Sequence, residues 1–150
     1  MDASEAELEI FVGRYLPAVA AIGRGAVRQL RMRLPGCDVL VYDNYQALAV
    51  GFSPDGKTGS AFLSVALYPR WVNLFFLQGA RLPDPDGLLQ GAGSIVRRVR
   101  LAGVGDLDLP QICGMIEAAI AQAPVPYEAG RQGRLVIKSI SAKQRPRRPA

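Results

Sequence analysis

The chain has 150 residues, of which 49% are hydrophobic and 21% charged, and its formal net charge is +5. This length suits one domain with one core, and no apolar run approaches the roughly 20 residues that a membrane-spanning helix needs. The charge excess lies near the C-terminus, beyond Glu128, and the other 13 basic residues are matched by 13 acidic ones. The excess is carried by Lys138, Lys143, Arg145, Arg147 and Arg148. A neutral body argues against a nucleic-acid-binding protein, and we expect residues 141–150 to form a basic, flexible tail.

The N-terminus and the cysteines both bear on where in the cell the protein is expected. The first residues, MDASEAELEI, carry acidic side chains, which is not the pattern of a secretory signal. Cys37 and Cys113 stand alone, without the short spacings of metal ligands. We expect a cytoplasmic protein that does not associate with membranes and that keeps both cysteines buried and reduced.

Two helices are predicted at the start of the chain. Ser4 and Glu7 have the S-x-x-E spacing of a capping box, and the apolar residues that follow repeat with a helical period up to Leu16. Pro17 suits the first turn of a second helix, because the missing amide hydrogen is not needed there. Pro35 and the glycine after it end this second helix.

Four strand candidates follow in the middle of the chain. They span residues 38–42, 45–52, 60–68 and 71–77. In the second of them, alternation places Leu48, Val50 and Phe52 on one face, which is typical of a half-buried strand. The Asp-Gly pair at 55–56 suits a hairpin turn, since glycine accepts a positive φ, and the Pro-Arg pair at 69–70 predicts a corner.

The second half of the chain is less regular. Residues 78–94 contain two prolines and four glycines and are predicted to form a long loop, a length that is often functional. A strand at 95–101, with Arg98 and Arg100 on one face, is followed by a helix at 108–121 and a strand at 134–140. We therefore predict one α+β domain over residues 1–140. In it, an antiparallel sheet of about five to six strands packs against helices on one face.

Several stretches carry a family resemblance when they are taken in order. A helix ends in LPG, a strand and turn read VYDNY, the hairpin strands carry LYPRWVNLFFL, and GAGSIVRRVRL enters a strand. In these features residues 17–140 resemble the YdhG-like family, a group of small bacterial domains of unknown function. The resemblance implies an α+β fold with helices on one antiparallel sheet, and some relatives carry a frataxin-like, iron-handling label. Family members often have a Met-Pro-Ala-Phe turn where this chain has Asp43-Asn44-Tyr45-Gln46, which marks a divergent branch.

Tyrosine, tryptophan and arginine side chains gather at the ends of the predicted strands. The set comprises Tyr42, Tyr45, Tyr68, Arg70, Trp71, Arg98 and Arg100. Phenol hydroxyls and guanidinium groups suit a carboxylate or phosphate ligand, and Trp71 offers a surface for stacking. The alternative is that the rings close the edge of the sheet and the arginines are solvated.

The helices carry two further sets of charges. Glu5 and Glu9 lie one turn apart, and their carboxylates suit either a hard cation such as iron or the positive end of the helix dipole. Arg24, Arg28 and Arg31 fall together on the polar side of the second helix. This basic stripe suits either an anionic partner or a solvated surface.

The sequence shows no catalytic or cofactor-binding pattern. The chain has no histidine to act as a general base near neutral pH. The Gly-Ala-Gly run at 91–93 precedes a strand, whereas a phosphate-binding loop opens a helix. We therefore expect a protein that is not an enzyme, uses no cofactor, and binds a small anionic ligand or a protein partner. The alternative function is iron handling through Glu5 and Glu9, and the oligomeric state is left open.

Overall fold

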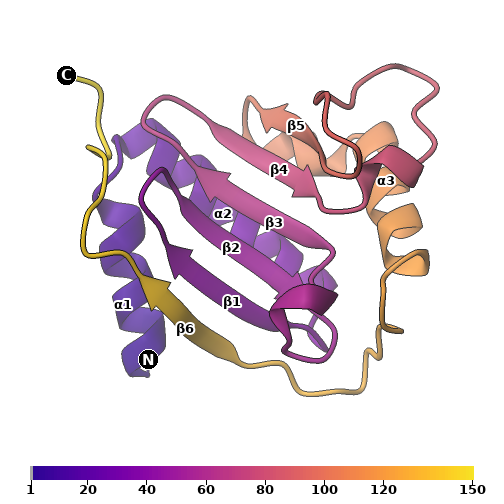
Figure 1. The fold of residues 1–150 in the computed structure, drawn as a ribbon, viewed down its shortest axis with the longest axis horizontal. Helices are drawn as coiled ribbons and strands as arrows, with labels where there is room; N and C mark the ends of the chain where they lie inside the picture. Colours follow the sequence, from indigo (N-terminus) through magenta and orange to yellow (C-terminus); the bar gives the residue numbers. More distant parts are fainter. Residues whose placement is uncertain (1) are drawn as a thin grey trace.

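The computed structural model describes residues 2–150. Within them the chain forms an α+β fold, as the sequence predicts (Figure 1). In chain order the elements are α1 (Ala3–Gly13), α2 (Pro17–Arg33), β1 (Asp38–Asp43), β2 (Leu48–Ser53), the 3₁₀-helix η1 (Thr58–Ser60), β3 (Leu63–Leu67), β4 (Val72–Phe76), η2 (Gly79–Arg81), β5 (Arg97–Leu101), η3 (Val104–Asp108), α3 (Pro110–Ala121) and β6 (Leu135–Ile140). None of the helices in this part of the chain is long and apolar enough to cross a membrane.

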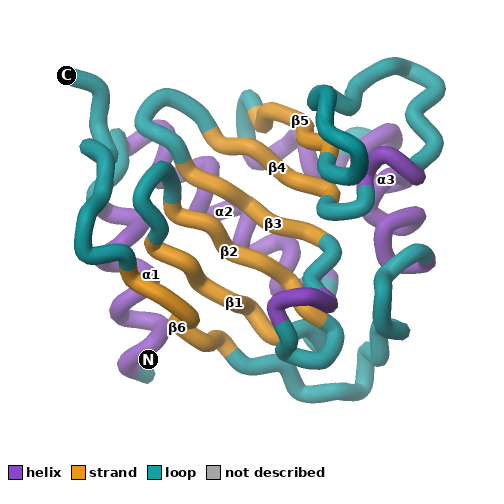
Figure 2. The backbone as a smooth tube through the Cα atoms, in the orientation of Figure 1, coloured by secondary structure: helices purple, strands orange, loops and turns teal. Residues whose placement is uncertain are grey.

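The strands form one sheet in the order β5-β4-β3-β2-β1-β6. Neighbours from β1 to β5 pair antiparallel, as predicted. β6 instead pairs parallel with β1, so the expectation of a wholly antiparallel sheet is wrong for this strand. A short hairpin turn forces the chain to reverse, but β6 follows α3 and a long loop that runs along one margin of the molecule (Figure 2). The direction of β6 is therefore set by where that loop returns to the sheet.

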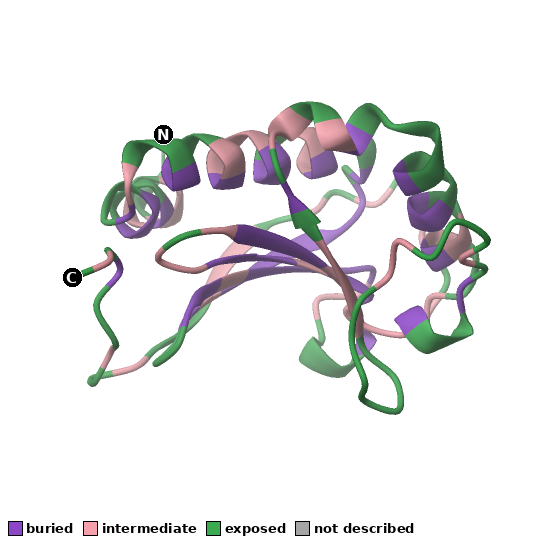
Figure 3. Cartoon of the chain, turned by 90° about the horizontal axis from the view of Figure 1, so that it is seen from above, coloured by how far each residue is buried: buried purple, intermediate pink, exposed green. Residues whose placement is uncertain are grey.

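Helices α1 and α2 cover one face of the sheet, and α3 packs at its end (Figure 3). The strands turn their large apolar side chains toward the helices, and Leu48, Val50 and Phe52 of β2 are fully buried there, as alternation predicts. Gly23 allows α2 to lie close to β3, because a Cβ at this position would be 2.6 Å from the side chain of Leu67. We call the opposite surface of the sheet, where only the short η1 lies over the ends of the strands, the open face.

The first helix is capped by a residue that the sequence analysis did not select. Asp2 is the N-cap of α1, and its Oδ1 accepts a hydrogen bond of 2.9 Å from the amide of Glu5. Ser4 lies inside the helix, so the predicted capping box of Ser4 and Glu7 is wrong. Asp2 and Glu5 have the same spacing and come first, so the helix starts there.

The two cysteines differ in environment. Cys37 is buried, as predicted, and burial raises the pKa of its thiol to about 12, although the charge of Arg131 acts in the opposite direction. Cys113 is exposed on α3, so the expectation that both thiols are buried is wrong. Its Sγ donates a hydrogen bond of 3.1 Å to the carbonyl of Leu107 in η3, the 3₁₀-helix that precedes α3.

The long loop before β5 folds back onto the sheet. Both carboxylate oxygens of Asp84 accept hydrogen bonds from backbone amides within this loop, at 2.8 and 2.9 Å. Gln90 then forms an isolated β-bridge with Arg98. The strand itself begins at Arg97, two residues later than the predicted range of 95–101, so Ile95 lies before it and is exposed.

The C-terminal segment packs against β1 and α1. Arg147 is buried, and its Nη2 donates a hydrogen bond of 2.8 Å to the carboxylate of Asp43, which is also buried. The same carboxylate accepts from Arg14 at 3.3 Å and from Gln144 at 2.9 Å. We call these four residues the Asp43 clamp. The sequence predicts only a flexible basic tail over residues 141–150. In the structure, Arg147 of this segment instead forms a buried ion pair with Asp43.

Candidate functional site

The centre of the open face is lined by small residues. Ala49 pairs with Ala66 and Gly51 pairs with Ser64 across β2 and β3. These positions alternate with the large core residues of the same strands, so they all point away from the helices. Figure 1 views this face, with α1 and α2 behind the sheet. We call these four residues the small-residue floor.

Aromatic side chains stand around this floor. Tyr45 from the β1–β2 turn, Tyr68 after β3 and Phe75 of β4 line a depression of about 340 Å³, which also includes Ala49, Ser64 and Ala66. Pockets for small ligands in proteins begin at about this volume and are mostly apolar with a few polar groups. The depression is therefore large enough for one small molecule.

Strand β5 adds two arginines next to this depression. Arg98 pairs with Phe75 in the sheet register, and Arg100 lies two residues further on the same face. The guanidinium carbon of Arg100 is 4.2 Å from the centre of the Trp71 ring, and that ring is 6.0 Å from the Tyr68 ring. Neither arginine forms an ion pair with any residue from 2 to 150. The open face therefore carries uncompensated positive charge beside aromatic rings.

A buried amide lies between the floor and the arginines. Asn73 of β4 pairs with Ala66 on one side and with Arg100 on the other. It is 5% exposed, and its Oδ1 has no hydrogen-bond partner among the described residues. Such a buried acceptor costs about 1–3 kcal/mol, so it calls for a functional explanation.

The phenol of Tyr68 is tuned by its surroundings. Burial raises the pKa of Tyr68 above its usual value, and the positive charge of Arg98 acts in the opposite direction. Tyr68 therefore stays neutral at physiological pH and keeps a hydroxyl hydrogen to donate.

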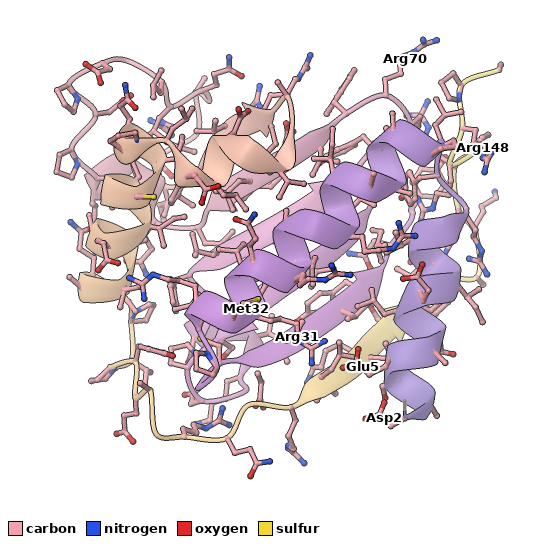
Figure 4. The ribbon with its side chains drawn as sticks, turned by 180° about the vertical axis from the view of Figure 1, so that it is seen from behind. Asp2, Glu5, Arg31, Met32, Arg70 and Arg148 are labelled. Atoms are coloured by element: carbon pink, nitrogen blue, oxygen red, sulfur yellow. The ribbon has the colours of Figure 1, made fainter. Side chains whose placement is uncertain are left out.

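The structure separates the seven predicted residues into two groups. Five of them border the depression or its arginines, namely Tyr45, Tyr68, Trp71, Arg98 and Arg100. Tyr42 lies on the open face, but its hydroxyl is 2.6 Å from Oγ1 of Thr58, which ties β1 to η1. Arg70 is exposed at the β3–β4 hairpin and points away from the molecule (Figure 4).

Sequence reasoning missed the floor and Asn73. The signal for the floor was present, because small residues alternate with large ones along both β2 and β3. The signal for Asn73 was also visible, since it is the one polar residue in the apolar run of β4. Alternation alone, however, does not show which strands lie side by side.

The acidic set on α1 has partners on α2. Glu5 pairs with Arg31 at 2.7 Å and Glu9 pairs with Arg24 at 2.6 Å, across a groove of about 390 Å³ (Figure 4). Two of the three arginines of the basic stripe are thus directed at α1, and Arg28 is exposed. Residues 2–150 contain no group of three or more potential metal ligands. A cation at this position would have to displace two guanidinium groups, so nothing here favours the iron-handling hypothesis.

The fold and the open face define the class of protein. It is a small α+β domain whose mixed sheet is covered by helices on one face and carries an aromatic depression beside Arg98 and Arg100 on the other. No protein-family model, curated protein or solved structure matches this chain. The resemblance to the YdhG-like family therefore stays a prediction.

Proposed function

We propose that this protein binds a small anionic ligand on the open face, in the depression beside Arg98 and Arg100. One observation carries the proposal: both guanidinium groups lie on the same face as Tyr68 and Trp71, and neither binds a carboxylate in the described chain. Hydrogen bonds between guanidinium and carboxylate or phosphate are among the strongest polar contacts in proteins.

The shape of the site favours a small molecule over a protein partner. The depression is a shallow, open hollow of about 340 Å³, and its lining is aromatic, small or uncharged. A protein partner would need a contact surface of about 800 Å² on this chain, far more than the hollow offers. The groups around the hollow can hold and orient an anion, and we assign no reaction to them.

The test is a thermal-shift titration with a panel of carboxylates and phosphates. At least one anion is expected to raise the melting temperature, and Arg98→Met and Arg100→Met should each reduce that shift. Arg28→Met is the matched control, because it removes the same charge at a different place. Arg28 is exposed on α2, on the other side of the sheet. The proposal is wrong if no anion has an effect, or if Arg28→Met reduces the shift as much as the open-face variants do.

A further inference from the structure

We infer that the ligand is a flat aromatic carboxylate, whose ring lies over the small-residue floor and whose carboxylate binds Arg98. This inference rests on the proposed function and narrows the class of ligand. It follows from the shape of the floor, the spacing of the strands and the contact of Arg100 with the Trp71 ring.

The floor suits a flat ring. Three of its residues line the hollow, and their side chains end at the β-carbon of Ala49 and Ala66 or at the single hydroxyl of Ser64. The fourth, Gly51, is buried and has Ala61 beside it, so the space for a ring lies over the other three. Tyr45, Tyr68 and Phe75 form the walls of the hollow. Ring–ring contacts contribute attraction beyond the burial of apolar area, so an aromatic ligand gains more here than an aliphatic one.

The distance from the floor to the arginines sets the size of the ligand. The floor ends at β3 and the arginines lie on β5, with β4 between them. Two strand spacings amount to about 10 Å, part of which the arginine side chain itself can cover. A fused two-ring acid reaches both the floor and a guanidinium group, whereas acetate or inorganic phosphate can contact only one of them.

The two arginines are not equivalent. Arg100 already lies over the Trp71 ring at 4.2 Å, a position that holds its guanidinium group by cation–π attraction. Arg98 has no such ring contact and no ion pair in the described chain, and its charge acts on Tyr68 at the wall of the hollow. One free guanidinium fork matches one planar carboxylate.

Isothermal titration calorimetry of the full chain with four probes tests this assignment. The probes are 2-naphthoate, acetate, inorganic phosphate and the neutral 2-naphthalenemethanol. We expect 2-naphthoate to bind at least about ten-fold more tightly than each of the other three. Arg98→Met should lower the affinity for 2-naphthoate by about ten-fold or more, because the carboxylate loses its charge-assisted hydrogen bonds.

A second pair of variants tests the floor without changing any charge. Ala49→Leu fills the hollow and should also lower the affinity for 2-naphthoate by about ten-fold. Ala18→Leu, on the exposed side of α2, should leave that affinity unchanged. Melting temperatures show whether each variant folds. If Ala49→Leu does not fold, the smaller change Ser64→Val replaces it, since Ser64 lines the same hollow and is partly exposed.

The outcomes separate this inference from the proposed function. If acetate or phosphate binds as tightly as 2-naphthoate, and Arg98→Met removes that binding, the anion site stands and the aromatic assignment is overturned. Equal binding of the neutral alcohol, or 2-naphthoate binding that Ala49→Leu and Ser64→Val leave unchanged, also overturns it. If no probe binds, or binding is the same in Arg98→Met, both the inference and the proposed function are overturned.

Discussion

The Asp43 clamp and the open face both place an arginine beside an aromatic ring. In the clamp the arginine is buried and paired with a carboxylate, whereas on the open face it is exposed and forms no ion pair within residues 2–150. Arg147 is 7% exposed, lies 5.8 Å from the centre of the Tyr15 ring and binds the carboxylate of Asp43. Arg100 is exposed, lies 4.2 Å from the centre of the Trp71 ring and binds no carboxylate within residues 2–150. Removing one partner of a buried ion pair strongly destabilises the fold, whereas a guanidinium group on the surface can stay available for a ligand.

The clamp joins parts of the chain that are distant in sequence. Arg14 from the end of α1 and Arg147 from the C-terminal segment meet at Asp43, the last residue of β1. Beside them, the Tyr15 hydroxyl accepts a hydrogen bond of 3.0 Å from the amide of Leu48. Burial raises the pKa of Tyr15 to about 12, and the charge of Arg147 acts against that shift. These contacts make the clamp part of the fold, in contrast to the open-face arginines.

The largest effect is expected from breaking the clamp. Arg147→Ala leaves the carboxylate of Asp43 buried with only the longer contact to Arg14 and the Gln144 amide, and should lower the free energy of unfolding by roughly 3 kcal/mol. Urea denaturation measures this loss. The control is Arg145→Ala, because Arg145 is exposed and its side chain forms no hydrogen bond among the described residues. Equal stability of the two variants would show that the clamp does not hold in solution.

A second buried carboxylate, Asp38, is also paired with an arginine, and its contribution to stability should depend on pH. Arg131 donates to Asp38 at 2.9 Å. Burial acts to raise the pKa of Asp38, but hydrogen bonds from Arg131 and from the Arg134 amide, with the charge of Arg131, hold that pKa below its usual value. The ionised carboxylate therefore stabilises the fold above its unfolded pKa of about 4, and this contribution is lost as the pH falls through the lower folded pKa.

Asp38→Asn should therefore be less stable than the native chain near neutral pH, and the difference should shrink in acid. Unfolding free energies measured between about pH 7 and pH 2 give this profile, since the range brackets the carboxyl pKa. Asp86→Asn is the control, because Asp86 is exposed and forms no ion pair within residues 2–150. A gap between Asp38→Asn and the native chain that stays constant with pH would contradict the assignment.

The smallest effect is expected at the open face. Arg98→Met should change the free energy of unfolding by no more than about 0.5 kcal/mol, since no ion pair is lost. Arg100→Met should cost at most about 1 kcal/mol, the value of an exposed cation–π contact. It should also change the fluorescence of Trp71, the single tryptophan of the chain. A loss at Arg98 as large as that of Arg147→Ala would mean that Arg98 has a structural role and would erase the contrast between the two regions.

Much of the fold could be predicted because it depends on local patterns. Alternation in β2 correctly placed Leu48, Val50 and Phe52 in the core, and the Pro-Arg corner at 69–70 was correctly placed between two antiparallel strands. The parallel pairing of β6 could not be predicted in this way, because no turn links it to its neighbour. For the same reason the ion pair of Asp43 with Arg147 left no local signal, since 104 positions separate the two residues.

For the candidate site, the sequence by itself determined which chemistry is available. It placed Arg98 and Arg100 on one face of a strand and tyrosine and tryptophan side chains at strand ends, because side-chain direction along a strand repeats every two residues. Only the tertiary structure decided which of these residues meet. Strand order brought β5 beside β4, set Asn73 between the small-residue floor and Arg100, and left Arg70 in solvent. That order depends on long-range pairing and packing, which no short stretch of sequence encodes.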